Sequence, residues 1–217
     1  CEQGGLMSYE WLIFDLDGTI SDPKQGIVRS FNFALEHYGF APQNEADIAA
    51  YIGPPLDQTF VQLTGNHDPL FIEMIVAKYR ERYAEVGYSE NHLYSGMKQV
   101  LLSLKEKEGC RLGVCTSKRA DFAERILAMF GLLDVFEFVS GGDIGIEKWQ
   151  QLESLIQAGT ISQNAVMIGD RAVDLTAAQH SQLDSAGVLW GYGSREELEQ
   201  ASPTHLFERP EQLIELL

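Results

Sequence analysis

A short apolar stretch that runs into two aspartates constrains the fold of this chain most. Residues 11–14 are an unbroken run of large apolar side chains, and Asp15, Asp17 and Gly18 follow them. Such a run without polar alternation is typical of a strand covered on both faces, as in a parallel sheet. The glycine predicts a backbone turn directly after the strand. Ligand sites in open α/β sheets lie at the carboxyl ends of strands, which is where Asp15 falls.

Asp15 and Asp17 are one residue apart, so their carboxylates repel unless a cation or a shared proton compensates them. A helix N-cap or a turn is the alternative interpretation, because aspartate is common in both. From average composition, the sequence Asp-x-Asp-Gly-Thr is expected by chance in roughly one such chain in several hundred. The pair therefore favours a functional site.

Strand and helix patterns alternate from Met97 to the C-terminus. Strands are predicted over residues 111–115, 135–139, 165–168, 186–189 and 206–207, with helices between them and a last helix from Pro210. Alternating β and α elements with short links predict an α/β fold, a doubly wound parallel sheet with a Rossmann-like core.

Residues 21–92 interrupt this alternation. They contain four helical patterns, around 27–38, 46–51, 56–63 and 69–86, and no convincing strand. Asp68 is a good N-cap for the last of these helices, with Pro69 at its first position. We therefore predict a small α-helical domain over 21–92, inserted in an α/β core formed by 1–20 and 93–217. Cys1 to Leu6 are excluded from the fold prediction.

Hydroxyl side chains follow the second predicted strand. Thr116 and Ser117 can donate to a phosphoryl oxygen, and the helix N-terminus after them attracts anions. The alternative is a Ser/Thr helix cap, which alone would be the simpler interpretation. Together with Asp15, the hydroxyls favour an anion site.

Two acidic residues follow the strand 165–168. Asp170 and Asp174 are four residues apart at the start of a helix, where they can hold or orient a hard cation or serve as ordinary partners of the helix dipole. An anion site beside the Asp15 carboxylate also needs a fixed positive charge nearby. Between Thr116 and Asp170 the only lysines are Lys118 and Lys148.

The composition is acidic, with 32 Asp and Glu against 16 Lys and Arg and a formal net charge of −16. This argues against nucleic acid or an anionic membrane as a partner, because both require clustered basic residues. Cys1, Cys110 and Cys115 have no zinc spacing and cannot all pair internally, which favours a reducing compartment. There is no signal-peptide pattern and no apolar run of membrane-spanning length, so we expect a cytoplasmic protein.

The segment Asp15-Leu16-Asp17-Gly18-Thr19 resembles the first motif of the haloacid dehalogenase superfamily, whose phosphatases use it as nucleophile and acid/base. Thr116 resembles the second motif, with Lys118 following as in phosphoglycolate phosphatase-like members. Lys148 lies where the third-motif lysine is placed, although Trp149 replaces the proline of many relatives. Residues 169–174 closely resemble the fourth motif.

The likeness extends over residues 9–217. The segment 188–198 is similar to the one that follows the fourth motif in the phosphoglycolate phosphatase and 5′-nucleotidase-like branch. One departure is Gln182, near which relatives often carry a helix-ending glycine. A residue other than glycine is strained there if a positive φ is required.

The resemblance implies catalytic roles for Asp15, Asp17, Thr116 and Lys148. Asp15 would attack phosphorus and form an aspartyl phosphate, and Asp17 would act as general acid and then as general base. Thr116 and Lys148 would hold the phosphoryl oxygens.

The resemblance also implies Mg²⁺ as cofactor. The Asp15 carboxylate, the Asp17 backbone carbonyl and Asp170 would hold the ion, and Asp174 would act on it through other ligands. Substrate-binding residues are predicted to be Thr116, Ser117, Lys118 and Gly53. Gly53 belongs to the rigid loop 51–56, which matches the specificity loop of the family's helical cap and is equally explained as a plain interhelix turn. Cations of this acidic block, namely Lys24, Arg80 and Arg82, are interpreted as solvated helix faces.

The leading hypothesis is a Mg²⁺-dependent phosphatase that acts on a small phosphorylated metabolite, as a monomer or homodimer. Phosphoglycolate is the first candidate substrate and a nucleoside monophosphate the second. The alternatives are a 5′-nucleotidase or phosphomutase of the same family, and a non-catalytic phospho-regulated module. A dehalogenase is disfavoured by Asp17. A generic nucleotide-binding sheet is disfavoured because no Gly-x-Gly-x-x-Gly follows the first strand.

Overall fold

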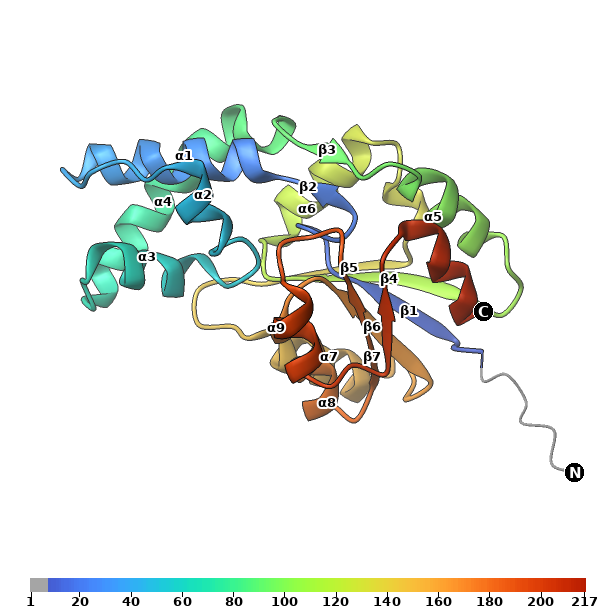
Figure 1. The fold of residues 1–217 in the computed structure, drawn as a ribbon. Helices are drawn as coiled ribbons and strands as arrows, with labels where there is room; N and C mark the ends of the chain where they lie inside the picture. The colour runs from blue at the N-terminus through green and yellow to red at the C-terminus, as the bar shows by residue number, and fades with distance from the viewer. Residues whose placement is uncertain (1–7) are drawn as a thin grey trace, which may run out of the picture.

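A computed structural model describes residues 8–217 and consists of a parallel sheet with a block of helices beside it (Figure 1). Six strands form the sheet in the order β5-β4-β1-β6-β7-β8, and every neighbouring pair is parallel. The strands are β1 Trp11–Phe14, β4 Arg111–Thr116, β5 Phe138–Gly141, β6 Ala165–Gly169, β7 Asp184–Val188 and β8 His205–Phe207. The expectation for Cys1 to Leu6 lies outside the described residues.

Strand β1 is covered on both faces, as its unbroken apolar run predicted. Trp11 and Ile13 pack into one cluster of buried side chains, whereas Leu12 and Phe14 pack into the other. All four are at most 1% exposed. Because successive strand residues point to opposite faces, this partition shows that helices seal both sides of the sheet.

The covering helices lie on opposite sides of the sheet, with α5, α6 and η3 on one side and α7, α8 and α9 on the other (Figure 1). Their bounds are α5 Met97–Lys105, α6 Ala120–Met129, α7 Lys148–Gln157, α8 Ala172–His180, α9 Arg195–Gln200, and the 3-10 helices η2 Leu133–Val135 and η3 Pro210–Leu216. The predicted doubly wound α/β fold is therefore confirmed.

The helical block comprises α1 Lys24–His37, α2 Glu45–Ala49, α3 Leu56–Thr64, α4 Pro69–Glu85 and the 3-10 helix η1 Gly87–Ser89. Asp68 caps α4 as predicted, since its side chain accepts from the Leu70 N–H. The expectation of no strand here is wrong at the two ends. β2 Ser21–Asp22 and β3 His92–Leu93 form an antiparallel pair that joins the ends of the block. The boundary at residue 92 falls inside β3, and the division into core and cap stays a prediction.

Two other predicted elements differ from the structure. The strand expected at 135–139 begins only at Phe138, because the N–H groups of Val135 and Phe136 are bonded within the preceding 3-10 turn. The helix from Pro210 is a 3-10 helix. At Gln182 the backbone has φ +57°, so the predicted strained conformation of a non-glycine residue is present.

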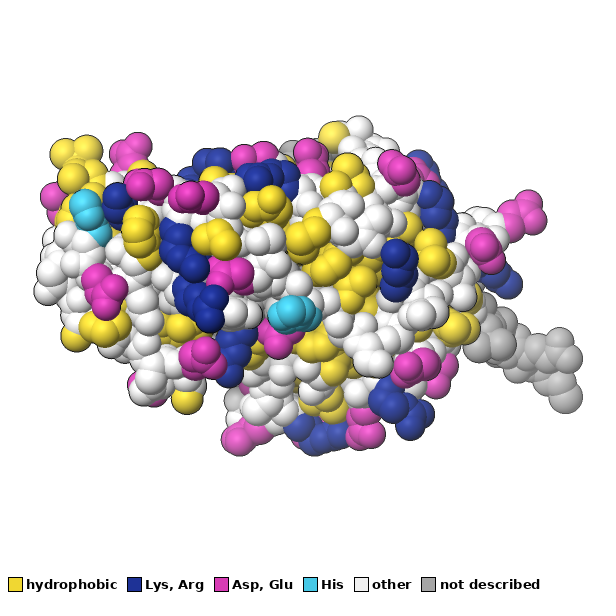
Figure 2. Space-filling model, turned by 90° about the horizontal axis from the view of Figure 1, so that it is seen from above, with side chains coloured by type: hydrophobic (Ala, Val, Ile, Leu, Met, Phe, Trp, Pro, Cys, Tyr) yellow, Lys and Arg dark blue, Asp and Glu magenta, His cyan; other side chains and the backbone are white. Residues whose placement is uncertain are grey.

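Surface charge is mixed on the face seen in Figure 2, where Lys and Arg side chains lie beside Asp and Glu side chains. Among residues 8–217, no helix is long and apolar enough to span a bilayer.

Gly26 of α1 lies against the backbone of η1, and its substitution tests this packing. A Cβ at Gly26 would lie 2.1 Å from the Gly87 carbonyl oxygen. Gly→Ala in an open helix stabilises by up to about 1 kcal/mol, but here we expect Gly26→Ala to lower the free energy of unfolding by about 1–3 kcal/mol. Urea unfolding measures this, with the exposed Glu36→Ala of the same helix as control. Equal or greater stability of Gly26→Ala would contradict the packing.

Glu90 gives a pH-dependent prediction. Burial opposes ionisation of Glu90, but bonds from Arg82 at 2.8 Å and Arg29 at 2.5 Å outweigh it, so the pKa of Glu90 lies below its ordinary value. The ionised carboxylate therefore stabilises the fold at neutral pH, and this contribution is lost as the pH falls through the folded-state pKa. We expect Glu90→Gln to cost about 1 kcal/mol at pH 7 and progressively less below pH ~4. A cost that does not vary with pH in urea unfolding, relative to Glu36→Gln, would refute this account.

Candidate active site

The carboxyl ends of the central strands bring the predicted site residues together. Asp15 follows β1, Thr116 ends β4 and Asp170 follows β6. The Asp15 N–H donates to the Ile168 carbonyl at 2.9 Å, which fixes Asp15 against β6. Asp15, Thr116 and Asp170 are 2%, 1% and 0% exposed, so all three polar side chains are withdrawn from bulk water.

Lys148 is the buried cation of the site. It is the first residue of α7 and is 2% exposed. Its Nζ lies 3.0 Å from Asp15 Oδ1 and also contacts Asp174 Oδ1. Trp149, which replaces the expected proline, packs its ring against His180 with the centroids 4.3 Å apart. The substitution therefore leaves Lys148 directed at Asp15.

Carboxylates outnumber the cation in this cluster, and the pKa values reflect it. Burial raises the pKa of Asp15 to about 7, with Asp174 and Asp17 adding to the rise and Lys148 opposing it. Burial, Asp15 and Asp174 raise the pKa of Asp170 well above its usual range. Burial opposes the charged form of Lys148, but Asp15 and Asp174 outweigh it and raise the pKa. A further positive charge would therefore stabilise the ionised carboxylates of this cluster.

The donor set fits a hard divalent cation. One carboxylate oxygen from each of Asp15, Asp170 and Asp174 lies within 4.8 Å of the others. Asp15 Oδ2 is buried and has no hydrogen-bond partner among the described residues. All-oxygen donors of this kind suit Mg²⁺. The Asp17 carboxylate is not part of this group. That Asp17 contributes its backbone carbonyl stays a prediction.

The surrounding backbone holds Asp170 tightly. Its Oδ2 accepts from the Tyr192 N–H at 2.8 Å, and its Oδ1 accepts from the Thr19 hydroxyl at 3.3 Å. Gly18 adopts φ +82°, and a Cβ there would lie 2.1 Å from Asp170 Oδ2. A glycine is therefore required after Asp17 both for the turn and for the close approach to Asp170.

Asp17 is linked to the helical block through Lys118. The Lys118 Nζ lies 3.0 Å from Asp17 Oδ2 and donates to the Tyr83 hydroxyl of α4 at 2.7 Å. Tyr83 is 1% exposed, which makes this contact a buried polar connection between the sheet and the helices. The Thr116 hydroxyl accepts from the Lys118 N–H at 3.1 Å.

One cleft lies between the strand ends and the helical block. Of the predicted residues, it is lined by Asp15, Asp17, Thr116, Ser117, Lys118 and Gly53. The remaining predicted residues, Lys148, Asp170 and Asp174, are fully buried next to Asp15. The structure thus brings together every residue that the sequence singled out, and their individual roles stay predictions.

Two arginines to which the sequence analysis assigned no function connect the helical block to the sheet side of the cleft. Arg171 Nη1 donates to the carbonyls of Ala50 and Ile52 at 2.8 Å each, while its Nε is held by Glu197 at 3.1 Å. Arg171 lies inside the acidic motif after β6, but no spacing in the sequence reveals that its partners are carbonyls of a distant loop. It thereby fixes the loop that contains Gly53.

Arg80 is the second of these arginines. It lines the cleft, is 17% exposed and pairs with Asp143 at 2.9 Å. Arg82, 18% exposed, is bound to Glu90. The prediction of solvated helix faces is therefore wrong for Arg80 and Arg82, because both are largely buried and paired with acidic side chains, Arg80 with Asp143 and Arg82 with Glu90. Lys24, in contrast, is 37% exposed beside Glu45.

Comparison with known proteins gives a consistent result. The family described as haloacid dehalogenase-like hydrolase matches residues 12–188. The chain is similar to the 5′-nucleotidase of Pseudomonas aeruginosa, with 36% identity over 92% of this chain and 91% of that protein. It is also similar to tyrosine-protein kinase PtkA of Mycobacterium tuberculosis, with 35% identity over 91% of this chain and 68% of that protein. A more distant relative is the phosphoglycolate phosphatase of Colwellia psychrerythraea, with 29% identity over 96% of this chain and 97% of that protein.

Solved structures share this fold. The crystal structure of a predicted phosphatase from Clostridium acetobutylicum superimposes with a TM-score of 0.89 and 30% identity, covering 95% of this chain and 96% of that one. The sheet and the helical block are both included in a match of this extent.

The carboxylate cluster predicts a stabilising response to Mg²⁺. At a Mg²⁺ concentration 100-fold above the dissociation constant, we expect the melting temperature to rise by about 5 °C. Asp170→Asn should abolish the rise, because it removes one carboxylate of the group, whereas the exposed Glu196→Gln of α9 should keep it. Differential scanning fluorimetry with Mg²⁺ or chelator measures both. An undiminished shift in Asp170→Asn would place the ion elsewhere.

Proposed function

The chain belongs to the haloacid dehalogenase-like hydrolase family and is a phosphatase, and from this we propose that it hydrolyses a small phosphate monoester with Mg²⁺ through an aspartyl-phosphate intermediate. One observation carries the proposal. Asp15 Oδ1 is held by Lys148, while its Oδ2 has no partner among the described residues and Asp15 lines the cleft. Lys148 thus fixes one Asp15 oxygen, and no group of the described residues competes with phosphorus for the other.

Asp15 Oδ2 is proposed to attack the phosphoryl group. A bond forms between this oxygen and phosphorus while the bond to the leaving oxygen breaks. The Thr116 hydroxyl and the ammonium of Lys148 hold non-bridging oxygens and stabilise the charge that builds up on them. Lys148 is suited to this because the surrounding carboxylates keep it protonated. Ser117, which also lines the cleft, provides a second hydroxyl.

Asp17 is proposed to move the protons. It gives a proton to the leaving oxygen and then takes one from the water that attacks phosphorus, which restores free Asp15 and releases phosphate. The position of Asp17 supports this role, since it lines the same cleft and is 8% exposed. Lys118 holds one Asp17 oxygen at 3.0 Å, and Oδ1 has no partner within residues 8–217.

Asp15, Asp170 and the backbone carbonyl of Asp17 would hold Mg²⁺, which when bound supplies positive charge next to the phosphoryl oxygens. Asp174 contacts Lys148 and accepts from the Arg171 N–H at 3.1 Å. Asp174 is therefore proposed to orient the Lys148 ammonium rather than to contact the substrate. Residues 21–92 are proposed to act as a cap, with the loop around Gly53 contacting the leaving group. A cytoplasmic location and a monomer or homodimer stay predictions.

The relatives suggest two substrates, phosphoglycolate and a nucleoside monophosphate. The name of the mycobacterial relative suggests phosphoryl transfer to another molecule, which the phosphomutase alternative shares. Steady release of inorganic phosphate separates hydrolysis from both.

Substitution of the nucleophile tests the mechanism. We expect Mg²⁺-dependent phosphate release from small phosphomonoesters, lost with chelator and reduced at least about a thousandfold in Asp15→Asn. The exposed Asp134→Asn is the matched control and should retain activity. Turnover that survives in Asp15→Asn would refute the covalent route. A stable phosphorylated Asp15 without phosphate release would favour a phosphomutase or a phospho-regulated module.

A further inference from the structure

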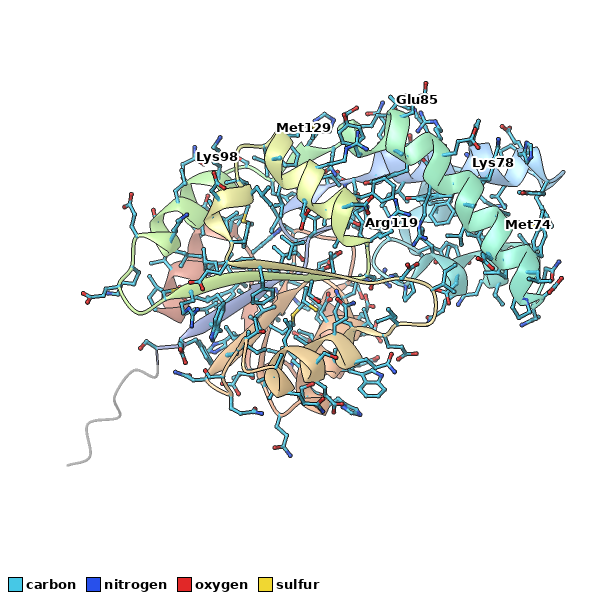
Figure 3. The ribbon with its side chains drawn as sticks, turned by 180° about the vertical axis from the view of Figure 1, so that it is seen from behind. Met74, Lys78, Glu85, Lys98, Arg119 and Met129 are labelled. Atoms are coloured by element: carbon cyan, nitrogen blue, oxygen red, sulfur yellow. The ribbon has the colours of Figure 1, made fainter. Side chains whose placement is uncertain are left out.

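The charges that line the cleft restrict the leaving group of the substrate. Lys148 is buried beside Asp15 and is not among the residues that line the cleft. The cleft is lined by three cations, and each already has an aspartate partner. The pairs are Lys118–Asp17 at 3.0 Å, Arg80–Asp143 at 2.9 Å and Arg119–Asp121 at 2.6 Å. Arg119 lies at the start of α6 beside α4 (Figure 3). Within residues 8–217, the cleft therefore offers no unpaired cation to a second anionic group.

Asp57 adds a negative charge that is not neutralised. It lies in the first turn of α3 and lines the cleft. Its Oδ2 accepts only a long bond from the Gly145 N–H at 3.4 Å, and its buried Oδ1 has no partner in the described part of the chain. No lysine or arginine of residues 8–217 pairs with it. A carboxylate on the leaving group would meet this charge, whereas a hydroxyl could donate to it.

Arg80 supplies the complementary donor. Its Nη2 is bound to Asp143, but its Nε is buried and unpartnered among the described residues. Arg80 and Asp57 line the same cleft, and each keeps one buried polar atom without a partner among residues 8–217. A polar, uncharged leaving group that carries both an acceptor and a hydroxyl satisfies the two without bringing a charge of its own.

The rest of the wall is apolar and aromatic. Besides the charged groups, the cleft is lined by side chains that offer carbon surface, among them Ile27, Phe31, Tyr51, Ile52, Phe122 and Ile144. A planar ring covers such a wall well. Glycolate has no apolar face, and a hexose carries hydroxyls on all sides.

From these features we propose that the leaving group is an uncharged nucleoside, so that the enzyme prefers nucleoside 5′-monophosphates to phosphoglycolate. This inference rests on the proposed phosphatase function and specifies its substrate class. The nucleoside supplies the hydroxyl for Asp57, an acceptor for Arg80 and the planar ring for the apolar wall. It also brings no carboxylate to a site whose cations are all paired.

Substrate comparison tests the proposal directly. We expect the kcat/KM for phosphate release from uridine or adenosine 5′-monophosphate to exceed that for phosphoglycolate at least about tenfold at saturating Mg²⁺. A value for phosphoglycolate that equals or exceeds that of the nucleotides would overturn the inference and leave the phosphatase function intact. Glucose 6-phosphate as the best substrate would also overturn it. No release from any of these esters would overturn both proposals.

Asp57→Asn tests the charge argument, because it removes the negative charge and keeps the size of the side chain. We expect the ratio of kcat/KM for phosphoglycolate to that for the nucleotide to rise about fivefold. Glu85→Gln is the matched control, since Glu85 lies on the outer surface at the end of α4 (Figure 3) and does not line the cleft. It should change the ratio less than about twofold. Equal ratios in the two variants would refute the role of Asp57.

Discussion

The contact of the Lys148 ammonium with Asp15 and Asp174 is the interaction on which the rest of the site depends. Removing several carboxylates from water is costly unless a cation compensates them, and Lys148 is the only buried lysine or arginine among residues 8–217. Lys148 is the first residue of α7, the helix that follows β5 in the chain. The sheet delivers Asp15 and Asp170, and α7 and α8 deliver Lys148 and Asp174. The geometry of the site and the fold are therefore specified by the same packing.

Polar contacts at the cleft connect the helical block to the sheet, in addition to a shared apolar core in which Tyr83 packs against Phe122. Lys118 reaches Tyr83, Arg171 reaches the carbonyls of Ala50 and Ile52, and Arg80 reaches Asp143. Such contacts are directional, and those at the rim are open to water. Arg171 fixes the position of the loop around Gly53 at the cleft. These contacts also pair the cations of the cleft, and the proposed preference for an uncharged leaving group rests on that pairing.

Elements with a strong local signal were predicted well from the sequence. The apolar run of β1, the N-cap Asp68 with Pro69, and the strand before Asp170 are all present in the structure. Weak local signals failed. The start of β5 was misplaced because Val135 and Phe136 are buried in a 3-10 turn, although they are as apolar as strand residues. β2 and β3 are two residues each, too short for any periodicity to reveal.

The parallel α/β sheet and the residues at its carboxyl edge could be predicted from the amino-acid sequence, because apolar runs, turn glycines and acidic motifs act within a few residues of chain. The pairing of the charges became visible only in the folded chain. Lys148 meets Asp15 across 133 residues and Arg171 meets the Ala50 carbonyl across 121, and no local pattern encodes such partners. Whether Arg80 is a solvated side chain or part of the cleft, and whether Asp57 lacks a cation, depends on distances that arise only when the helices pack over the sheet.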